Sequence, residues 1–300
     1  MAASHKLKAD GFLANEHACV SYLFRKRWPW GFTCPFCGEV QKDIAPAYVV
    51  VCRYCRKQTS ITAHTLMHGS KNSLMAWMQV ARQFCLQSRG ISARELQQLM
   101  GLSCYQTAWI WLQKIRRAAA LAESAPCCGI VFFDIVSLPV VTAADKTTPD
   151  IGIALELKNC KETKKRVKFV VLETRSAEAL TAAAKILIQP NTALMVRERD
   201  WPLRECLQES YLCGQPSVEQ LEQGRLLLQE TETWLATVFR GAIDSRYLQS
   251  YLDEFSFRCN TSFWTDRLAV LDHLLTGLVA FSARIGKTRQ HQRDNEGRRV

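Results

Sequence analysis

The sequence predicts an α+β chain of several domains, and three observations support this fold class. Two Cys-x-x-Cys pairs lie near the N-terminus, two helical patterns joined by a short turn follow, and a β-rich segment with one helix occupies residues 126–200. At 300 residues, the chain is long enough for two or three domains, at least one with a sizeable core of its own.

The four clustered cysteines have the spacing of a metal site. Cys34 and Cys37 form the first pair, and Cys52 and Cys55 form the second. Four thiolates complete a tetrahedral zinc shell and leave no open position for water, so we expect one structural Zn²⁺ in a zinc ribbon. This ribbon, with a flanking helix, is predicted over residues 1–70. The other cysteines have no ligand spacing and are interpreted as small buried apolar residues.

Residues 71–122 contain a helix-turn-helix pattern. Ser92 with Glu95, and Ser103 with Gln106, are capping-box pairs at two helix starts, and Gly101 suits the sharp turn between them. The second helix, residues 104–118, is the candidate recognition helix. The predicted DNA contacts are Tyr105 and Gln106 at base edges, and Lys114, Arg116 and Arg117 near phosphates. A plain helical hairpin with a basic end remains the alternative.

The β-rich segment has the element order of a ribonuclease-H-like fold, predicted over residues 126–285. The runs GIVFFDIV, DIGIALELK and VKFVVLE read as three antiparallel strands, followed by a helix in SAEALTAAAKILI and a fourth strand in TALMVRE. In such a fold, a carboxylate on the first strand and one after the fourth hold two divalent metals. Asp134 suits the first position, and Glu198 and Asp200 follow the fourth strand.

Charge and hydropathy indicate the class of partner. The net charge is +11 at pH 7, which favours a polyanion, with double-stranded DNA as the first candidate. No apolar run is long enough to span a bilayer, and the N-terminal residues lack the apolar core of a signal peptide. We therefore expect a cytoplasmic protein without membrane contact. Residues 286–300 are predicted to be a basic disordered tail.

Four segments of the sequence resemble the zinc-ribbon insertion-sequence transposases, the ISXO-like group related to Merlin transposons. The segments run nearly from end to end of the chain: EHACVSYLFRKRWPWGFTCPFCG, CRYCRKQTSITAHTLMHGSKNSLMAWM, GISARELQQLMGLSCYQTAWIWLQKIR and WLATVFRGAIDSRYLQSYLDEFSFRCN. This resemblance implies a DNA-binding mobile-element protein that performs DNA transposition, with Mg²⁺ as a further cofactor only where its catalytic core is active.

The catalytic motifs of that family are degenerate in this sequence. Asp134 is present, but Ile135 follows it where the family has an acidic motif, and the Asp-Gly pair after the fourth strand is missing from RERDWPLREC. Depending on the anchor, Arg199 or Glu198 takes the second acid's position. In the third motif, Arg225 or Leu226 stands where a polar ligand is expected and Glu232 where a lysine is expected, with Glu230 as a stand-in after a register shift.

These observations predict a transposase-like, zinc-containing DNA-binding protein with a decayed catalytic core, repurposed as a regulator or accessory protein. Two alternatives remain open. The first is an active transposase that cleaves and joins DNA with Asp134, Glu198, Asp200 and Glu230, and the second is a zinc-stabilised protein-interaction scaffold. A homodimer or a higher homo-oligomer is compatible with each.

Overall fold

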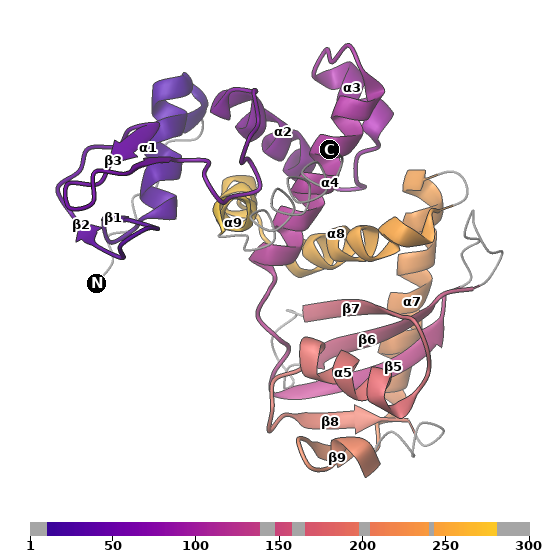
Figure 1. Ribbon diagram of the computed structural model, residues 1–300. Coiled ribbons are helices and arrows are strands. Elements are labelled where there is room, and N and C mark those ends of the chain that lie inside the picture. The colour runs from indigo at the N-terminus through magenta and orange to yellow at the C-terminus, as the bar shows by residue number, and fades with distance from the viewer. Residues whose placement is uncertain (1–10, 139–147, 158–165, 198–204, 240–242, 281–300) are drawn as a thin grey trace, which may run out of the picture. The chain divides into compact units, whose positions relative to one another are not determined.

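The computed structural model describes residues 11–138, 148–157, 166–197, 205–239 and 243–280 (Figure 1). Two compact units divide these residues. The first comprises residues 11–87, 96–122 and 266–280, and the second comprises residues 88–95 and 123–265. Glu198, Asp200 and the predicted basic tail lie outside the described residues.

The first unit begins with a 3₁₀ turn, a helix and two small hairpins. These elements are η1 (Gly11–Leu13), α1 (Glu16–Arg27), β1 (Phe32–Thr33), β2 (Val40–Gln41), β3 (Val49–Val51) and β4 (Gln58–Ser60). β1 pairs with β2 and β3 pairs with β4, both antiparallel. Each hairpin carries one of the two cysteine pairs at its turn, as the spacing predicts for a zinc ribbon.

Three longer helices complete the first unit: α2 (Leu74–Leu86), α4 (Tyr105–Ala122) and α9 (Arg267–Val279). The indole rings of Trp77 on α2 and Trp111 on α4 stack, with centroids 5.0 Å apart. At Gly277 on α9, an added Cβ would lie 1.9 Å from the carbonyl oxygen of Ala118, so the α4 and α9 backbones meet directly. α9 therefore packs with α4, although the sequence groups it with the β-rich domain.

A short helix, α3 (Ala93–Leu99), precedes α4. Its predicted capping box is present, since the Ser92 hydroxyl accepts from the Glu95 N–H at 3.2 Å and the Glu95 carboxylate accepts from the Ser92 N–H at 2.9 Å. Gly101 takes a φ of +60° in the turn, a conformation that costs most other residues energy. The two helices and the turn thus lie where the sequence predicts them.

The second unit is a five-stranded mixed sheet with helices on both faces (Figure 1). The strand order is β7-β6-β5-β8-β9, in which β5 is antiparallel to β6 and parallel to β8. The strands are β5 (Ile130–Ser137), β6 (Asp150–Leu157), β7 (Arg166–Leu172), β8 (Ala193–Val196) and β9 (Leu212–Gly214), and the helices are α5 (Ala177–Leu187), α7 (Val218–Phe239), η3 (Ser245–Tyr247) and α8 (Leu248–Thr261).

The central strand β5 is buried on both faces. Val131, Phe133 and Ile135 pack with α5, whereas Phe132 packs in the cluster that contains residues of α7 and α8. Side chains alternate along a strand, so Asp134 shares the face of Phe132. At Gly224 on α7, an added Cβ would lie 2.4 Å from the Phe132 ring, which shows how closely α7 approaches β5 beside Asp134.

Candidate functional site

The four predicted cysteines converge on one point in the first unit. The sulfur atoms of Cys34, Cys37, Cys52 and Cys55 all lie within 4.8 Å of one another. Sγ of Cys34 lies 3.6 Å from Sγ of Cys55, and Sγ of Cys37 lies 3.8 Å from Sγ of Cys52. Zinc–sulfur bonds of about 2.3 Å in a tetrahedron separate the sulfurs by about 3.8 Å, so the cysteines are positioned to bind a structural zinc ion.

The two cysteine knuckles have the same backbone geometry. The N–H of Gly38 donates to the carbonyl of Cys34 at 2.9 Å, and the N–H of Arg56 donates to the carbonyl of Cys52 at 3.0 Å. Both residues have positive φ, +76° at Gly38 and +61° at Arg56. The turn therefore requires the left-handed conformation in each knuckle, and the sequence supplies a glycine in only one of them.

Polar contacts hold the zinc ligands in place. The Gln41 amide nitrogen donates to Sγ of Cys52 at 3.1 Å, and its oxygen accepts from the N–H of Arg53, also at 3.1 Å. Hydrogen bonds from the backbone, above all at Cys55, lower the pKa of the Cys52 thiol to about 6. These hydrogen bonds favour the thiolate form of Cys52, which is the form that binds zinc.

The predicted DNA contacts on α4 fall into two groups. Tyr105, Gln106 and Arg117 are exposed, and Tyr105 presents 49% of its surface at the start of the helix. Arg116 is 2% exposed, and Nζ of Lys114 lies 5.4 Å from the ring centre of Trp77, with its pKa lowered by burial. Arg116 lies in the interior of the unit, on the face of α4 that it shares with the buried Leu112 and Ala119, and we withdraw it as a phosphate contact.

The carboxylate of Asp134 is buried and paired with an arginine. It is 3% exposed, its Oδ1 accepts from the N–H of Ile135 at 3.0 Å, and its Oδ2 lies 2.8 Å from Nη2 of Arg197. The pair follows from strand register, since Phe133 on β5 is aligned with Val196 on β8 and Arg197 comes next. The guanidinium also lies 5.7 Å from the Phe132 ring centre.

Asp134 therefore has an ionic partner in the interior of the second unit, Arg197. Arg197 is not among the site residues that the sequence predicts. Alternation along the fourth strand indicates that Arg197 faces the opposite side of the sheet from Val196, but its pairing with Asp134 depends on the register of β5 and β8.

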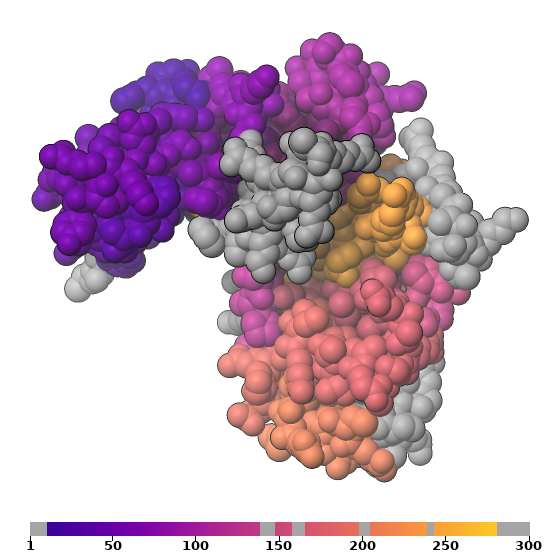
Figure 2. Space-filling model, viewed as in Figure 1, coloured from indigo at the N-terminus to yellow at the C-terminus, as the bar shows by residue number. Residues whose placement is uncertain are grey.

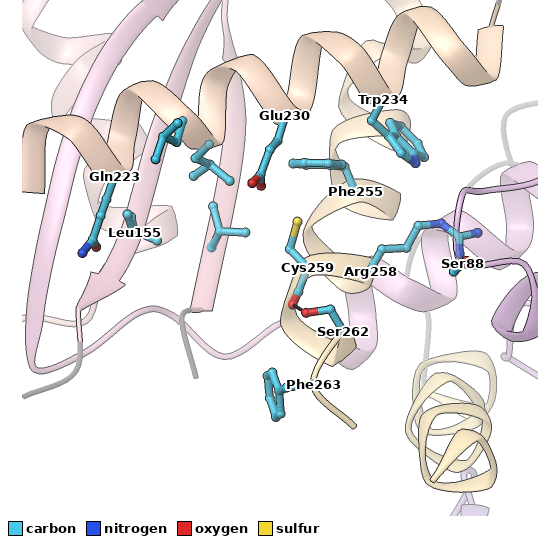
Figure 3. Close-up of a pocket in the computed structure, with 13 residues that line it drawn as sticks. Ser88, Leu155, Gln223, Glu230, Trp234, Phe255, Arg258, Cys259, Ser262 and Phe263 are labelled. Carbon is cyan, nitrogen blue, oxygen red and sulfur yellow. Dashed lines mark hydrogen bonds between the residues drawn. The ribbon is translucent and has the colours of Figure 1, made fainter. Parts of the chain in front are cut away.

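Glu230, another predicted acid, lies on α7 at a separate feature of the second unit. It lines a cavity of about 430 Å³ together with Cys259 and Trp234, and Asp134 does not line this cavity (Figure 3). The Glu230 carboxylate points toward the Cys259 thiol (Figure 3). Burial and, to a smaller extent, the charge of Glu230 raise the pKa of that thiol to about 12.

Within the described residues, the four cysteines are the only group of three or more histidine, cysteine or acidic side chains whose ligand atoms converge. Asp134 and Glu230 are therefore not brought together in such a group, and Glu198 and Asp200 fall outside this part of the chain. The expectation that the cysteines outside the zinc site are buried is wrong for three of them, which are exposed: Cys104, Cys128 and Cys206. No helix in the described residues is long and apolar enough to cross a membrane.

Comparisons with known proteins identify the N-terminal region. A comparison with curated proteins finds no match to this chain. Residues 14–66, which include all four cysteines, match the family model described as the transposase zinc-ribbon domain. The N-terminal region of this chain is therefore similar to the zinc ribbons of insertion-sequence transposases.

Proposed function

We propose that this protein is a transposase-like DNA-binding protein whose catalytic domain no longer performs metal-dependent chemistry. It acts as a regulator or accessory protein in the cytoplasm, with double-stranded DNA as its partner. The main support for this loss of activity is the ion pair between Asp134 and Arg197, in which Oδ2 and Nη2 lie 2.8 Å apart.

The ion pair argues against a divalent cation at Asp134. Two-metal sites need several carboxylate oxygens and neutral or anionic surroundings. In this chain, a fixed positive charge lies against the carboxylate that both ions would share. The strand order β7-β6-β5-β8-β9, with β5 central, supports a ribonuclease-H-like fold, in which Asp134 has the position of the first catalytic acid.

DNA binding is supported by residues 11–122. They contain the transposase-type zinc ribbon, and α3, the Gly101 turn and α4 have the order expected of a helix-turn-helix. Tyr105 and Gln106, at the start of α4, are exposed and could contact base edges. Arg117 is exposed and could contact a phosphate. The net charge of +11 favours the same partner.

The test uses the full-length protein and genomic DNA fragments. Binding sites selected from those fragments supply the cognate duplex, and affinity is measured over a salt series. We expect affinity to fall steeply with salt, Gln106→Ala to weaken discrimination between sequences, and Arg117→Ala to weaken binding to all sequences alike. Arg225→Ala, which removes an exposed arginine of α7, is the matched control.

A cleavage assay on the same duplex tests the loss of chemistry. We expect no nicking or joining with Mg²⁺ or Mn²⁺. Metal-dependent cleavage that disappears in Asp134→Asn would overturn the proposal and favour the active transposase with Glu198, Asp200 and Glu230. An absence of duplex binding at low salt would leave the interaction-scaffold alternative.

A further inference from the structure

Two exposed aromatic rings stand at equivalent positions of the two zinc knuckles. Phe36 precedes Cys37 and is 52% exposed, and Tyr54 precedes Cys55 and is 79% exposed. Exposed apolar side chains that gather in one patch mark interaction sites, and the two knuckles that carry these rings converge on one cysteine cluster. Atoms of the ribbon, coloured indigo to violet, are visible on the face drawn in Figure 2.

Cations lie near both knuckle rings, in space at Phe36 and in the sequence at Tyr54. Nζ of Lys57 lies 4.7 Å from the ring centre of Phe36, and Tyr54 lies between Arg53 and Arg56 in the sequence. Arg53, Arg56 and Lys57 are all exposed. The ribbon's acids, Glu39 and Asp43, belong to the first hairpin and its connection, so the second knuckle is cationic.

Arg56 adopts a strained backbone conformation. Its φ of +61° is the left-handed conformation that Gly38 adopts freely in the first knuckle. For a residue with a Cβ this conformation costs about 1 kcal/mol. A glycine would relieve that cost, and Arg56 supplies an exposed cation at this position instead.

We propose that the two knuckles bind nucleobases that are not covered by neighbouring bases, with Phe36 and Tyr54 as stacking surfaces and Arg53, Arg56 and Lys57 on the phosphates. The ligand class is DNA with unpaired bases, such as a frayed or single-stranded end. Aromatic rings stack on an exposed base face, which the interior of a duplex hides, and cations along the strand complete such sites. This inference rests on the proposed DNA-binding function and names a second mode of contact within it.

The experiment compares three probes that share one sequence: a blunt duplex, the same duplex with a single-stranded extension, and the single strand alone. 2-Aminopurine in the extension reports stacking through fluorescence quenching. With full-length protein, we expect the extended duplex to bind about tenfold tighter than the blunt one. Phe36→Leu with Tyr54→Leu should abolish this preference and the quenching, and leave blunt-duplex affinity unchanged.

Two controls separate stacking from structure. Tyr48→Leu removes an exposed aromatic residue of the same ribbon outside the knuckles and should keep the preference. Arg56→Gly should retain zinc and unfold at higher denaturant concentration, yet bind the extension more weakly. Loss of zinc without loss of binding in Arg56→Gly would assign the arginine to the metal site and overturn its role here.

The outcomes distinguish this inference from the proposed function. Tight blunt-duplex binding with no preference for the extension, or a preference that survives the double substitution, overturns the inference alone. Preference for single strands without duplex binding overturns the helix-turn-helix proposal and keeps the inference. Failure to bind any of the three probes overturns both.

Discussion

The zinc ribbon and the Asp134 region contain the two sites at which the sequence suggests metal chemistry, and they differ in how many ligands converge. In the ribbon, four sulfur atoms lie within 4.8 Å of one another. At Asp134, one buried carboxylate lies 2.8 Å from Nη2 of Arg197. A metal site depends on a complete set of negative or neutral ligands, which the four cysteines supply and a single carboxylate paired with a guanidinium does not.

The largest effect should come from breaking the ribbon. Cys37→Ser removes one of four thiolates, and structural zinc contributes about 10 kcal/mol or more to folding in small zinc modules. We expect loss of zinc by metal analysis and unfolding of the ribbon by circular dichroism and limited proteolysis, with the mixed sheet intact. Cys128→Ser, at an exposed cysteine outside the site, should retain zinc. A zinc-free wild type would contradict the structural role of the metal.

The next effect should come from breaking the Asp134 pair. Arg197→Met leaves a carboxylate that is 3% exposed without its cation and should destabilise the sheet by about 3 kcal/mol. Asp134→Asn should cost less, because Arg197 is 27% exposed and can turn its guanidinium to water. The double variant should recover part of the loss. Hydrogen exchange of β5 measures all three, and equal protection in Arg197→Met and wild type would contradict the pairing.

A smaller effect should come from Gln41, which contacts a zinc ligand without being one. Gln41→Leu keeps the buried side chain's size and removes the hydrogen bond to Sγ of Cys52. We expect zinc affinity to fall about tenfold, in the range found for residues that orient metal ligands. Competition with a chromophoric chelator measures this change. Thr33→Val, at an exposed position of β1, should have no effect on zinc affinity.

The smallest effect should come from an exposed ion pair, whose contribution to stability can be compared with that of the buried Asp134–Arg197 pair. Arg175 donates to both carboxylate oxygens of Asp150 at 2.6 and 2.7 Å, and this lowers the pKa of Asp150. A lowered folded-state pKa stabilises the fold above the ordinary Asp pKa, and the gain disappears as pH falls through the lowered value.

Because the Arg175 side chain is 51% exposed, the gain should be under about 1 kcal/mol. NMR titration of the Asp150 carboxyl in wild type and Arg175→Ala measures the shift. An unchanged titration midpoint in Arg175→Ala would show that the arginine is not its cause.

Local spacing allowed much of residues 11–122 to be predicted from the sequence. Two cysteines three residues apart must place their sulfurs on one side of a turn, so the ligand set of the zinc site follows from the pattern alone. The same holds for the capping box of Ser92 and Glu95, whose hydrogen bonds span three residues. The element order of the sheet was likewise readable from runs of apolar and β-branched residues.

Features that depend on distant segments were decided only by the tertiary structure. Asp134 and Arg197 meet because β5 and β8 pair in parallel, and no local pattern states that register. Arg116 is buried because α4 is covered by other helices, including α9, which joins it from the far end of the sequence. The sequence determines which short-range contacts the chain can make. Packing between remote segments determines which charged side chains remain hydrated at the surface and which are paired in the interior.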